Sequence, residues 1–522
     1  MIQVLYVSSV SACFELENEK PFYAPQSYTV FLNEQKLFED HRNVFSVFGL
    51  QPGSENTVEL LYEDGTSERV VFSAEKTLCG INVKDFGAKG DGVNDDSEAI
   101  QAAIHFLPKG GLLHFPAGTY LTAPLALKSH MTIEFAENAT ILGRTERSCY
   151  QVLPGEVEDM YSEDSTIFSA FEGNVMSMYQ SLIHAAYAED ITVIGPGCVD
   201  GNAVNSDWWQ GFKENPVARP RLFFFNHCKD ITIHGITGKN SASWQFHPFF
   251  SQNVRLLDVY VEAPKDSPNT DAMDPESCDH VDIIGCRFSV GDDCIAIKSG
   301  KIELGKKYKT PADHHTIRNC LMNFGHGAVT LGSEIGAGVK NLSVSQCYFR
   351  GTDRGLRIKT RRGRGQDCVL DGILFENILM EGVLTPVGIN MWYNCCDPDR
   401  FSEYVWSREH LPVDERTPHL GSFTFRNLTC TDVQVAACYI DGLPEMPIDE
   451  VIFENTSFAY AEDALPGKPI MKNHAEDVCK LGLYLDNVRH IKLDGVTVNG
   501  SDGPGLITAH YEQLETPDFK EV

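Results

Sequence analysis

Four short segments of the sequence carry ionisable residues of the types that acid–base catalysis uses. They are SPNTDAMDPESC with Asp271, SVGDDCIAIKSG with Asp292 and Asp293, NFGHGAVTLGSE with His326, and RGLRIKTRRGRG with Arg357 and Lys359. Several carboxylates beside basic residues suit glycosidic cleavage, because one carboxylic acid protonates the leaving oxygen while another carboxylate activates water. Alone, an Asp-Asp pair or a Gly-His-Gly segment is usually a turn. Four such segments in order indicate a site.

A repeated strand pattern predicts how these segments are brought together. An alternation of apolar residues around a central Asn, Gly, Asp or Cys recurs as ITIHGITG, VRLLDVYV, VDIIGCRF, HTIRNCLM, LSVSQCYF, ILFENILM, FTFRNLTC, VIFENTSF and IKLDGVTV. Spacings of about 23 to 34 residues suit one coil of a solenoid whose coils stack about 4.8 Å apart. The sequence therefore predicts an all-β protein with a right-handed parallel β-helix. The ionisable segments are also about one coil apart, so their side chains should form a column on one face.

The β-helix is expected to cover residues 79–522, after a small β-sandwich at residues 1–78. A strand, a glycine-rich turn and the capped amphipathic helix NDDSEAIQAAI begin the solenoid and should cover its open end. The first 78 residues read as short alternating strands separated by turns. Their segment FGLQPGSENTV resembles a turn of fibronectin type III domains. The sandwich has no catalytic cluster, so it is a spacer or packing module, or else a carbohydrate-binding surface.

Composition excludes several classes of function. Lys and Arg number 43 against 73 Asp and Glu, and the resulting charge of −30 opposes nucleic-acid binding. Runs of about 18 apolar residues are missing, so we expect no contact with a membrane. The N-terminal segment has no basic residue before its apolar run, which predicts no secretory signal and a cytoplasmic location. Sixteen scattered Cys residues then suggest reduced thiols, and the adjacent Cys395 and Cys396 are poorly placed to bridge one another. Oligomeric state is left open.

The four ionisable segments resemble the Asn-Thr-Asp, Gly-Asp-Asp, Gly-His-Gly and Arg-Ile-Lys motifs of the polygalacturonases, glycoside hydrolase family 28. The resemblance runs from about Asn82 to near the C-terminus. It implies hydrolysis of α-1,4-linked galacturonic acid in homogalacturonan or pectin oligosaccharides, with inversion at the anomeric carbon and no metal or other cofactor. It also implies roles for single residues: Asp292 is the general acid, Asp271 and Asp293 hold the nucleophilic water, His326 tunes the acid, and Arg357 and Lys359 bind the uronate carboxylate.

Physical reasoning adds three expectations about the carboxylates. Crowding should raise the pKa of one of them, and we expect that one to be the acid, Asp292. A bend at Gly291 should let Asp292 and Asp293 both reach the cleft, because neighbouring residues of a regular strand point to opposite faces. Asn269 should bind substrate or orient Asp271. An inverting enzyme should also hold the carboxyl of Asp292 about 6.5–9.5 Å from the other two.

A cluster of basic residues surrounds the Arg-Ile-Lys segment. Seven basic residues and one acid lie between Arg350 and Arg364, in a chain of strongly negative charge. Such a patch collects anions, and Arg binds carboxylates through two parallel hydrogen bonds. The alternation places Arg357 and Lys359 on one face of a strand. Arg362 and Arg364 are expected on a solvated surface.

The long loops suggest that the enzyme attacks chain ends. Residues 373–423 exceed one simple coil, and DWWQGFKENPVARPRLFFF precedes the regular coils. Both could close one end of a groove, and DWWQGF and SWQFHPFF resemble segments of bacterial exo-acting family members with a fibronectin-like front domain. Candidate subsite residues are Trp244, His247, Asn390 and Trp392, although core packing explains Trp244 equally well.

Other activities on the same solenoid remain open at this stage. Endo-acting and rhamnogalacturonan-type hydrolases share the motifs. A pectate lyase would bind Ca²⁺ through carboxylates and eliminate rather than hydrolyse. A binding or fibre protein would need no catalytic column, so the four segments would be a coincidence.

Overall fold

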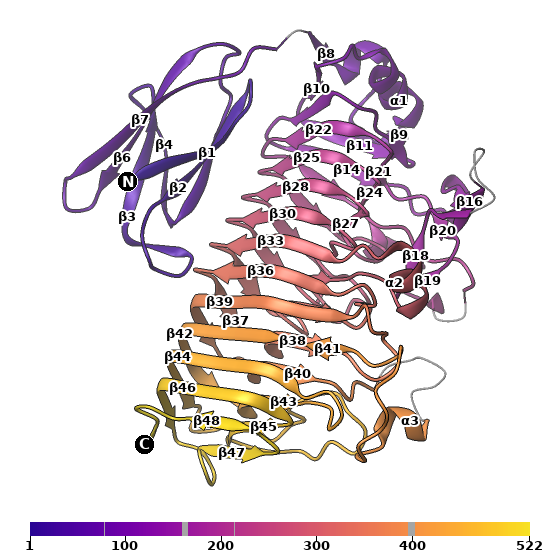
Figure 1. Cartoon of the computed structure of the whole chain (residues 1–522). Helices are drawn as coiled ribbons and strands as arrows, with labels where there is room; N and C mark the ends of the chain where they lie inside the picture. Colours follow the sequence, from indigo (N-terminus) through magenta and orange to yellow (C-terminus); the bar gives the residue numbers. More distant parts are fainter. Residues whose placement is uncertain (78, 159–164, 213–214, 395–401) are drawn as a thin grey trace.

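The computed structural model describes residues 1–77, 79–158, 165–212, 215–394 and 402–522. Most of the chain winds into a stack of parallel coils that runs from β8 to β49, with a separate group of strands beside its N-terminal half (Figure 1). This is the right-handed parallel β-helix that the repeat predicted.

Three parallel ladders of strands form the walls of the solenoid. The first contains β8 (Gly80–Asn82), β10 (Gly111–Phe115), β13 (Met131–Phe135), β22 (Glu189–Ile194), β25 (Lys229–His234), β28 (Gln252–Leu257), β30 (Asp279–Ile284), β33 (Ala312–Arg318), β36 (Val339–Ser345) and β48 (Gln513–Glu515). The second contains β9 (Asp91–Asp95), β11 (Gly118–Thr122), β14 (Ala139–Gly143), β23 (Cys198–Asp200), β26 (Thr237–Lys239), β29 (Tyr260–Glu262), β31 (Arg287–Ser289), β34 (Leu321–Asn323), β37 (Tyr348–Arg350) and β49 (Lys520–Glu521). Long strands span both ladders in the later coils, namely β39 (Val369–Glu381), β42 (Ser422–Val433), β44 (Ile448–Tyr460) and β46 (Val488–Asn499), with β41 (His419–Leu420) between β39 and β42.

The third ladder is interrupted in the middle of the molecule. Its first part contains β12 (Leu125–Ala126), β21 (Ile183–Ala186), β24 (Phe223–Asn226) and β27 (Phe246–Phe249). Its second part contains β32 (Ile295–Ile297), β35 (Val329–Gly332), β38 (Arg354–Lys359), β40 (Thr385–Asn390), β43 (Ala436–Asp441), β45 (Leu481–Asp486) and β47 (Leu506–Ala509). Isolated bridges at Met273 and Glu276 join the two parts. The coil that contains Asp271 is therefore irregular on this wall.

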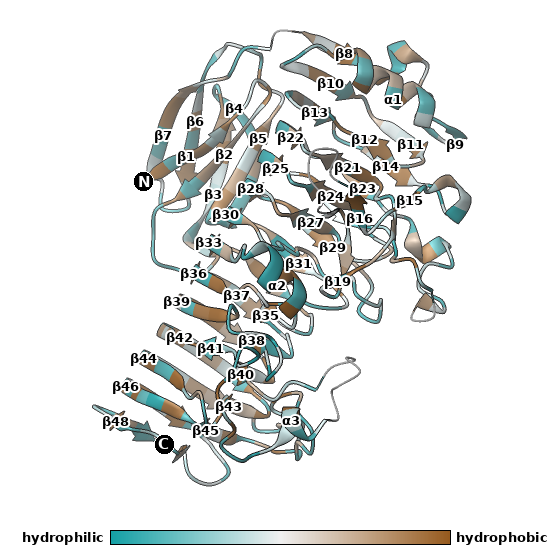
Figure 2. Ribbon diagram, turned by 45° about the vertical axis from the view of Figure 1, so that its right-hand side comes forward, coloured by the Kyte–Doolittle hydropathy of each residue, from teal (hydrophilic) through white to brown (hydrophobic). Residues whose placement is uncertain are grey.

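The solenoid interior is filled by residues that repeat from coil to coil. Burial alternates along strands such as β13, and Figure 2 shows hydrophobic and hydrophilic residues interspersed along the coil strands. Phe375, Phe425 and Phe453 stack with ring centroids 5.9 and 4.6 Å apart. At a turn, Asn455 and Asn427 each donate a 2.8 Å side-chain hydrogen bond to the Asn of the preceding coil. The repeat therefore produces ladders of Phe in the interior and of Asn at a turn.

Helix α1 (Ser97–Phe106) lies at the N-terminal end of the solenoid and buries Ile100, Ala103 and Ile104 against its core. The predicted helix is confirmed, but its capping differs. The Asp96 side chain accepts hydrogen bonds from the amides of Lys89 (2.6 Å) and Gly90 (2.9 Å) instead of capping the helix. Asp96 therefore fixes the preceding glycine-rich turn.

Residues 2–73 form two antiparallel sheets that enclose a core of their own. One sheet has the order β1-β2-β5 and the other β4-β3-β6-β7. Their bounds are β1 (Ile2–Val7), β2 (Ser11–Leu16), β3 (Tyr23–Leu32), β4 (Gln35–Arg42), β5 (Val44–Phe48), β6 (Glu55–Tyr62) and β7 (Ser67–Ser73). This arrangement matches the predicted sandwich of short strands.

Buried polar contacts attach these sheets to the coils. Arg42 Nη1 donates to Asp258 Oδ1 (2.6 Å), and Ser46 Oγ donates to Asp258 Oδ2 (2.8 Å). Glu15 accepts hydrogen bonds from Arg318 Nε (2.7 Å) and Nη2 (2.9 Å). The Val44 side chain also packs closely on the backbone of Gly285, since a Cβ at Gly285, whose φ is +69°, would lie 2.4 Å from a Val44 methyl group. These contacts lie on the turn between the first two ladders, so the sheets brace several coils without using the third ladder.

Short elements project from the coils on the side of the third ladder (Figure 1). Hairpin strands are β15 (Val152–Leu153), β16 (Glu156–Glu158), β17 (Ser165–Ile167), β18 (Ala170–Phe171), β19 (Asn174–Val175) and β20 (Met178–Tyr179), and the helices are α2 (Ile302–Tyr308) and α3 (Glu403–Trp406). Within the described part of the chain, none of the helices is both long and apolar enough to cross a membrane. The cysteines of this part are free thiols, whereas Cys395 and Cys396 lie outside the described residues. The cytoplasmic location stays a prediction.

The substitution Glu15→Ala should loosen the attachment of the N-terminal sheets. It removes the acceptor for Arg318 and also for Asn319 Nδ2, which lies 2.7 Å from Glu15. We expect the free energy of unfolding to fall by about 2 kcal/mol, because the guanidinium and amide lose a largely buried partner. Urea unfolding followed by tryptophan fluorescence measures the loss. Lys36→Ala, at an exposed ion pair, is the control, and equal behaviour of the two variants would contradict the role of Glu15.

Candidate active site

The ionisable segments meet where the third ladder is interrupted. Backbone hydrogen bonds join Ala272 N to Asp293 O (3.2 Å) and Cys294 N to Gly327 O (2.8 Å). Another joins Ala328 N to Arg354 O (2.8 Å). The segments therefore occupy successive coils in register, and the predicted column of side chains is present in the structure.

Three carboxylates lie close together in this column. One oxygen each from Asp271, Asp292 and Asp293 lies within 4.8 Å of the others. Asp271 and Asp293 are buried, whereas the Asp292 side chain is 21 % exposed. Successive coils and consecutive residues bring the three groups together, so their nearest oxygens lie closer than the 6.5–9.5 Å expected between the carboxyl groups of an inverting enzyme.

Two cations hold the Asp293 carboxylate. Arg357 Nη1 donates to its Oδ1 (2.8 Å) and Lys359 Nζ donates to its Oδ2 (2.9 Å). Burial alone would raise the pKa of Asp293, but Lys359 and Arg357 lower it far below its ordinary value. Asp293 is therefore ionised, and both cations already have a partner inside the protein.

The other two carboxyl groups have different surroundings. Burial, together with the neighbouring Asp274 and Asp292, raises the pKa of Asp271 well above its ordinary value. Asp292 Oδ1 accepts a hydrogen bond from the amide of Asp293 (2.9 Å) and lies 3.2 Å from His326 Nδ1. This hydrogen bond raises the pKa of His326. The carboxyl group whose pKa is raised, by burial first and by its acidic neighbours second, is therefore Asp271.

Two glycines make room for this arrangement. Gly291 has no positive φ, but a Cβ at this position would lie 2.5 Å from the Ser267 carbonyl oxygen. The chain bends at Gly291 and Asp292, as expected, and close packing also requires glycine at position 291. A Cβ at Gly327 would lie 2.9 Å from Asp293 Oδ1 and would also collide with the Thr330 hydroxyl. The last glycine of Gly-His-Gly thus leaves space for the carboxylate that the two cations hold.

A solvent-open pocket adjoins the two cations on the side of the later coils. About 410 Å³ of empty space is bounded by His326, Asp353, Arg354, Arg357, Ile358, Lys359, Gly388, Asn390, Tyr393, Ile470 and Met471. Arg357 Nη2 also donates to the sulfur of Met471 (2.9 Å). The pocket is therefore cationic on its floor and partly apolar on its wall.

Two of the predicted binding residues are near the site but have protein partners. Asn269 Oδ1 accepts a hydrogen bond from Arg219 Nη2 (2.6 Å). Asn390 lines the pocket, where its Nδ2 donates to the Met471 carbonyl (2.7 Å) and its Oδ1 accepts from the Trp392 amide (2.9 Å). Both side chains hold the surrounding framework in the substrate-free structure.

The predicted subsite roles of Trp244, His247 and Trp392 are wrong, because these side chains are buried. Trp244 stacks on Phe171 with ring centroids 5.1 Å apart. His247 is fully buried with Nε2 3.1 Å from Glu276. The Trp392 indole donates to the Gly442 carbonyl (3.0 Å). None of the three lines the pocket beside the cations, and core packing was the correct alternative for Trp244.

A buried ionic network beneath the site was not identified from the sequence. Lys298 Nζ lies 3.4 Å from both Asp274 and Glu334 and 4.6 Å from the centre of the Trp244 ring. Burial raises the pKa of Asp274 to about 8. Asp274 lies three residues after Asp271, and Lys298 directly follows β32, which begins two residues after Asp293. Closeness in sequence to the motifs was therefore the available signal. Among the described residues, Asp271 Oδ1 and both Asp274 oxygens have no hydrogen-bond partner.

Part of the basic patch is structural. Arg362 was expected on a solvated surface, but it is fully buried and donates to both oxygens of Glu445 (2.5 and 2.9 Å) and to the Ser407 carbonyl (2.6 Å). Arg364 is buried as well. Arg362 thereby fixes the insertion around α3 to the coils. The expectation of two solvated arginines was wrong because the insertion covers them.

Two groups of described residues could share a metal ion. One is the carboxylate trio, where the positive charges of Arg357 and Lys359 already offset much of the negative charge. The other consists of Asp279, His280 and His314, on the first ladder.

Comparison with known proteins identifies the family. The model of glycosyl hydrolases family 28 matches residues 163–465, which is more than half of the chain and includes the whole column. The chain belongs to glycosyl hydrolase family 28. A second model, rhamnogalacturonase A/epimerase, pectate lyase-like, matches residues 80–143 of this family 28 hydrolase.

Relatives of this family 28 hydrolase include both exo- and endo-acting enzymes. A probable polygalacturonase of Vitis vinifera is 29 % identical over 393 residues, covering 73 % of this chain and 74 % of the relative. An exo-poly-alpha-D-galacturonosidase of Dickeya chrysanthemi is 26 % identical, covering 70 % of this chain and 67 % of the relative. An endo-polygalacturonase of Pectobacterium parmentieri is also 26 % identical, covering 57 % of this chain and 72 % of the relative.

Two solved structures share the fold. The exopolygalacturonase of Thermotoga maritima has a TM-score of 0.63 and 26 % identity, covering 77 % of this chain and 93 % of that chain. The family 28 exopolygalacturonase of Yersinia enterocolitica has a TM-score of 0.69 at 18 % identity and covers 99 % of both chains. The architecture therefore extends over the whole chain, including its N-terminal sheets.

Gly327→Ala should impair catalysis more than folding. The added methyl group pushes against the Asp293 carboxylate and the Thr330 hydroxyl. We expect turnover to fall by about 100-fold, since displacements of about 1 Å at a catalytic group have effects of that size. The activity of the purified variant is compared with that of Gly80→Ala, where a Cβ meets open space. Full activity of Gly327→Ala would show that the carboxylate position is not tightly constrained.

Proposed function

We propose that this hydrolase cleaves α-1,4-galacturonosyl linkages in homogalacturonan or its oligosaccharides, from a chain end and with inversion. The observation that carries the proposal is the pair Arg357 and Lys359 beside three clustered carboxylates, at the floor of an open pocket. Cations at the reaction centre select an acidic sugar. The polygalacturonases among the relatives support the same substrate class.

Exposure assigns the roles of the carboxylates in this proposal. Asp292 is the proton donor, because it is the most exposed of the three and contacts His326. His326, a cation when protonated, supplies positive charge to Asp292 and thereby controls its protonation. Asp271 and Asp293 hold the water that attacks the sugar. No metal or other cofactor takes part in these steps.

Substrate binding also changes the state of Asp293. A uronate carboxylate that reaches Arg357 and Lys359 competes with Asp293 for the same donors. Loss of these donors raises the pKa of Asp293, because they are the groups that lower it. Asp293 then becomes a better base for water. A neutral sugar cannot bind Arg357 and Lys359 in place of Asp293, so Asp293 stays weakly basic. The competition for the two cations therefore adds selectivity for acidic substrates.

Inversion follows from the lack of an available nucleophile. Even when a substrate carboxylate takes its cations, Asp293 remains enclosed, since its side chain is only 1 % exposed. Asp271 is buried, and its raised pKa favours the protonated form. Neither group is ready to form a covalent intermediate despite the short spacing, so water is the attacking species.

The first product released should therefore have the inverted, β anomeric configuration. Proton NMR of early time points, recorded before mutarotation, distinguishes the anomers. Tri-galacturonate is the substrate, and a commercial retaining glycosidase acting on its own substrate serves as the technical control. An α product would show retention through a covalent intermediate, as the spacing alone suggests.

Cleavage should be hydrolytic and should depend on Asp292. Asp292→Asn keeps the shape of the side chain but removes its acidic proton, so we expect turnover to fall by about 10³-fold. Reducing-sugar release from polygalacturonate and absorbance of unsaturated products are followed together. Asp266→Asn, in an exposed position on the preceding loop, is the matched control. An ultraviolet-absorbing product would indicate a Ca²⁺-type lyase instead, and an active Asp292→Asn would exclude this residue as the acid.

Insertions around the earlier coils support attack at chain ends. Arg221 Nη2 donates to the Ala170 carbonyl (2.6 Å), and Phe171 of the same hairpin covers Trp244. Trp208, from the aromatic insertion recognised in the sequence, packs against Tyr179 with ring centroids 5.0 Å apart. The strands of the hairpins β15–β20 and residues 201–212 and 215–220 thus stand beside the coil of Asp271. We propose that they close this end of the groove.

An exo-acting enzyme should release one small product from the first turnover onward. A time course on long polygalacturonate measures viscosity and product size together, and viscosity should fall slowly. The endo-polygalacturonase relative of Pectobacterium parmentieri provides the control for rapid viscosity loss. An early collapse of viscosity with a mixed ladder of oligomers would contradict exo action without affecting the hydrolase assignment.

A further inference from the structure

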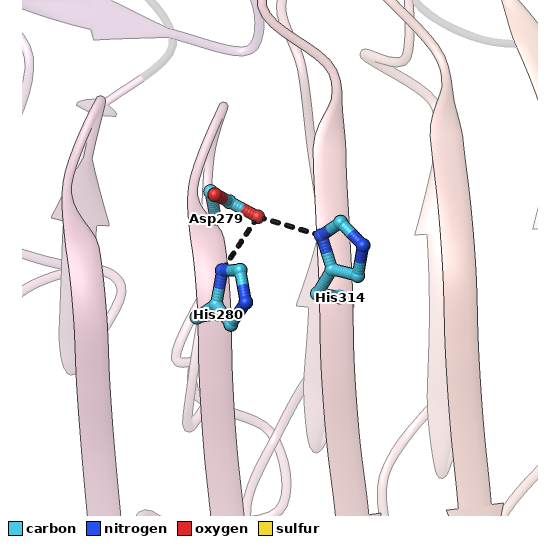
Figure 3. A group of neighbouring side chains, drawn as sticks. All are labelled: Asp279, His280 and His314. Carbon is cyan, nitrogen blue, oxygen red and sulfur yellow. Dashed lines mark hydrogen bonds and ion pairs between the residues drawn. The ribbon is translucent and has the colours of Figure 1, made fainter.

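Two Asp-His pairs lie on successive coils of the first ladder, on a different wall from the catalytic column. Asp279 and His280 begin β30, and Asp313 and His314 lie near the start of β33. The parallel register pairs Asp279 with Asp313 and Val281 with His315, so the two imidazoles stand on adjacent rungs. Figure 3 shows both rings directed toward the Asp279 carboxylate.

The three side chains converge on one point. Asp279 Oδ1 lies 2.9 Å from Nδ1 of His280 and 2.9 Å from Nδ1 of His314. The two rings are nearly parallel, with centroids 4.7 Å apart. All three groups are accessible, since His280 is 60 %, His314 50 % and Asp279 40 % exposed. Two nitrogens and one oxygen therefore surround a position that solvent ions can reach.

A purely structural ladder does not require this pair of histidines. The flanking rungs carry Asn253 and Asn341 at the same register position, also with positive φ. Asn341 alone forms the cross-coil contact of its rung, where its Nδ2 donates to Asp313 (2.8 Å). His314 makes the equivalent contact to Asp279, but His280 directs a second imidazole at the same oxygen. His280 and His314, where the flanking rungs have asparagine, thus provide imidazole nitrogens that the cross-coil contacts do not require.

We propose that Asp279, His280 and His314 bind a divalent transition-metal ion, Zn²⁺, Ni²⁺ or Cu²⁺, through the two Nδ1 atoms and a carboxylate oxygen. Bonds of about 2.1 Å separate ligand atoms by about 3.0 Å at the right angles that Cu²⁺ and Ni²⁺ adopt and by about 3.4 Å in the tetrahedral geometry of Zn²⁺. The observed nitrogen–oxygen distances of 2.9 Å are close to the first value and need only a small side-chain movement for the second. The ion takes the place of the Nδ1 protons, and each neutral ring keeps its proton on Nε2. Imidazole nitrogen favours these ions over Ca²⁺ and Mg²⁺, which prefer oxygen ligands.

Such an ion would add a further link between two coils that backbone hydrogen bonds and the contact of His314 with Asp279 already join. The ligands come from two strands, β30 and β33, which lie side by side only in the folded chain. The unfolded chain therefore has no equivalent site, and metal binding stabilises the folded solenoid. The site does not touch the carboxylate trio. The inference is therefore independent of the proposed hydrolysis.

Titration calorimetry of the full chain with Zn²⁺, and separately with Cu²⁺, tests the site. We expect one ion per chain and a rise in melting temperature of about 2 °C or more at saturation. The double variant His280→Asn/His314→Asn copies the flanking rungs and should fold normally, but its affinity should be weaker by at least about 10-fold. With Cu²⁺, electron paramagnetic resonance should show coupling to two nitrogens in the wild type alone.

The matched control is His130→Asn. His130 lies 3.2 Å from Glu189 and 3.0 Å from Asp190, so it is a single imidazole between two carboxylates. Its substitution should leave the metal isotherm unchanged. Equal binding by the wild type and the double variant would overturn the proposal, as would equal affinity for Ca²⁺ and Zn²⁺. Unchanged hydrolysis by the double variant would confirm that the site is separate from the catalytic column.

Discussion

Backbone hydrogen bonding between successive coils is the constraint on which this structure depends. Each coil lies about 4.8 Å above the last, so residues in register form columns whether or not their side chains attract one another. The same geometry that stacks Phe375 on Phe425 in the core also places the buried Asp271 beside Asp293 at the surface of the third ladder. Crowded like charges are therefore imposed by the backbone, and the surrounding residues must compensate for them.

Compensation takes a different form for each carboxylate. Asp293 is neutralised by Arg357 and Lys359, whereas burial raises the pKa of Asp271. Beneath them, Lys298 lies between Asp274 and Glu334. The network keeps several ionisable groups in a volume from which water is largely excluded, where charge interactions are stronger than in solvent. A site of this kind responds strongly to the arrival of one more carboxylate, which is the charge that a uronate brings.

Insertions and glycines adapt a repetitive scaffold to a single function. The hairpins β15–β20 and the segment around α3 add walls to a surface that the coils alone would leave open, and buried arginines such as Arg221 and Arg362 fix them in place. The N-terminal sheets brace the coils from the turn between the first two ladders. The third ladder, which carries the carboxylates, thus stays accessible, because the N-terminal sheets attach to a different side of the solenoid.

The sequence alone determined the solenoid and its catalytic column, because a period of about one coil is visible in the strand pattern and the motifs repeat at that period. It could not determine which side chains are covered by segments distant in sequence. Trp244, His247, Trp392 and Arg362 were assigned to the surface or to subsites, yet insertions and neighbouring coils bury them. Nor could the sequence show how the protonation states of Asp271, Asp292 and Asp293 differ. The pKa of each carboxyl group depends on its burial and on charged partners that are distant in sequence. Asp293 and Lys359 are an example, because only the tertiary structure brings their side chains within 2.9 Å.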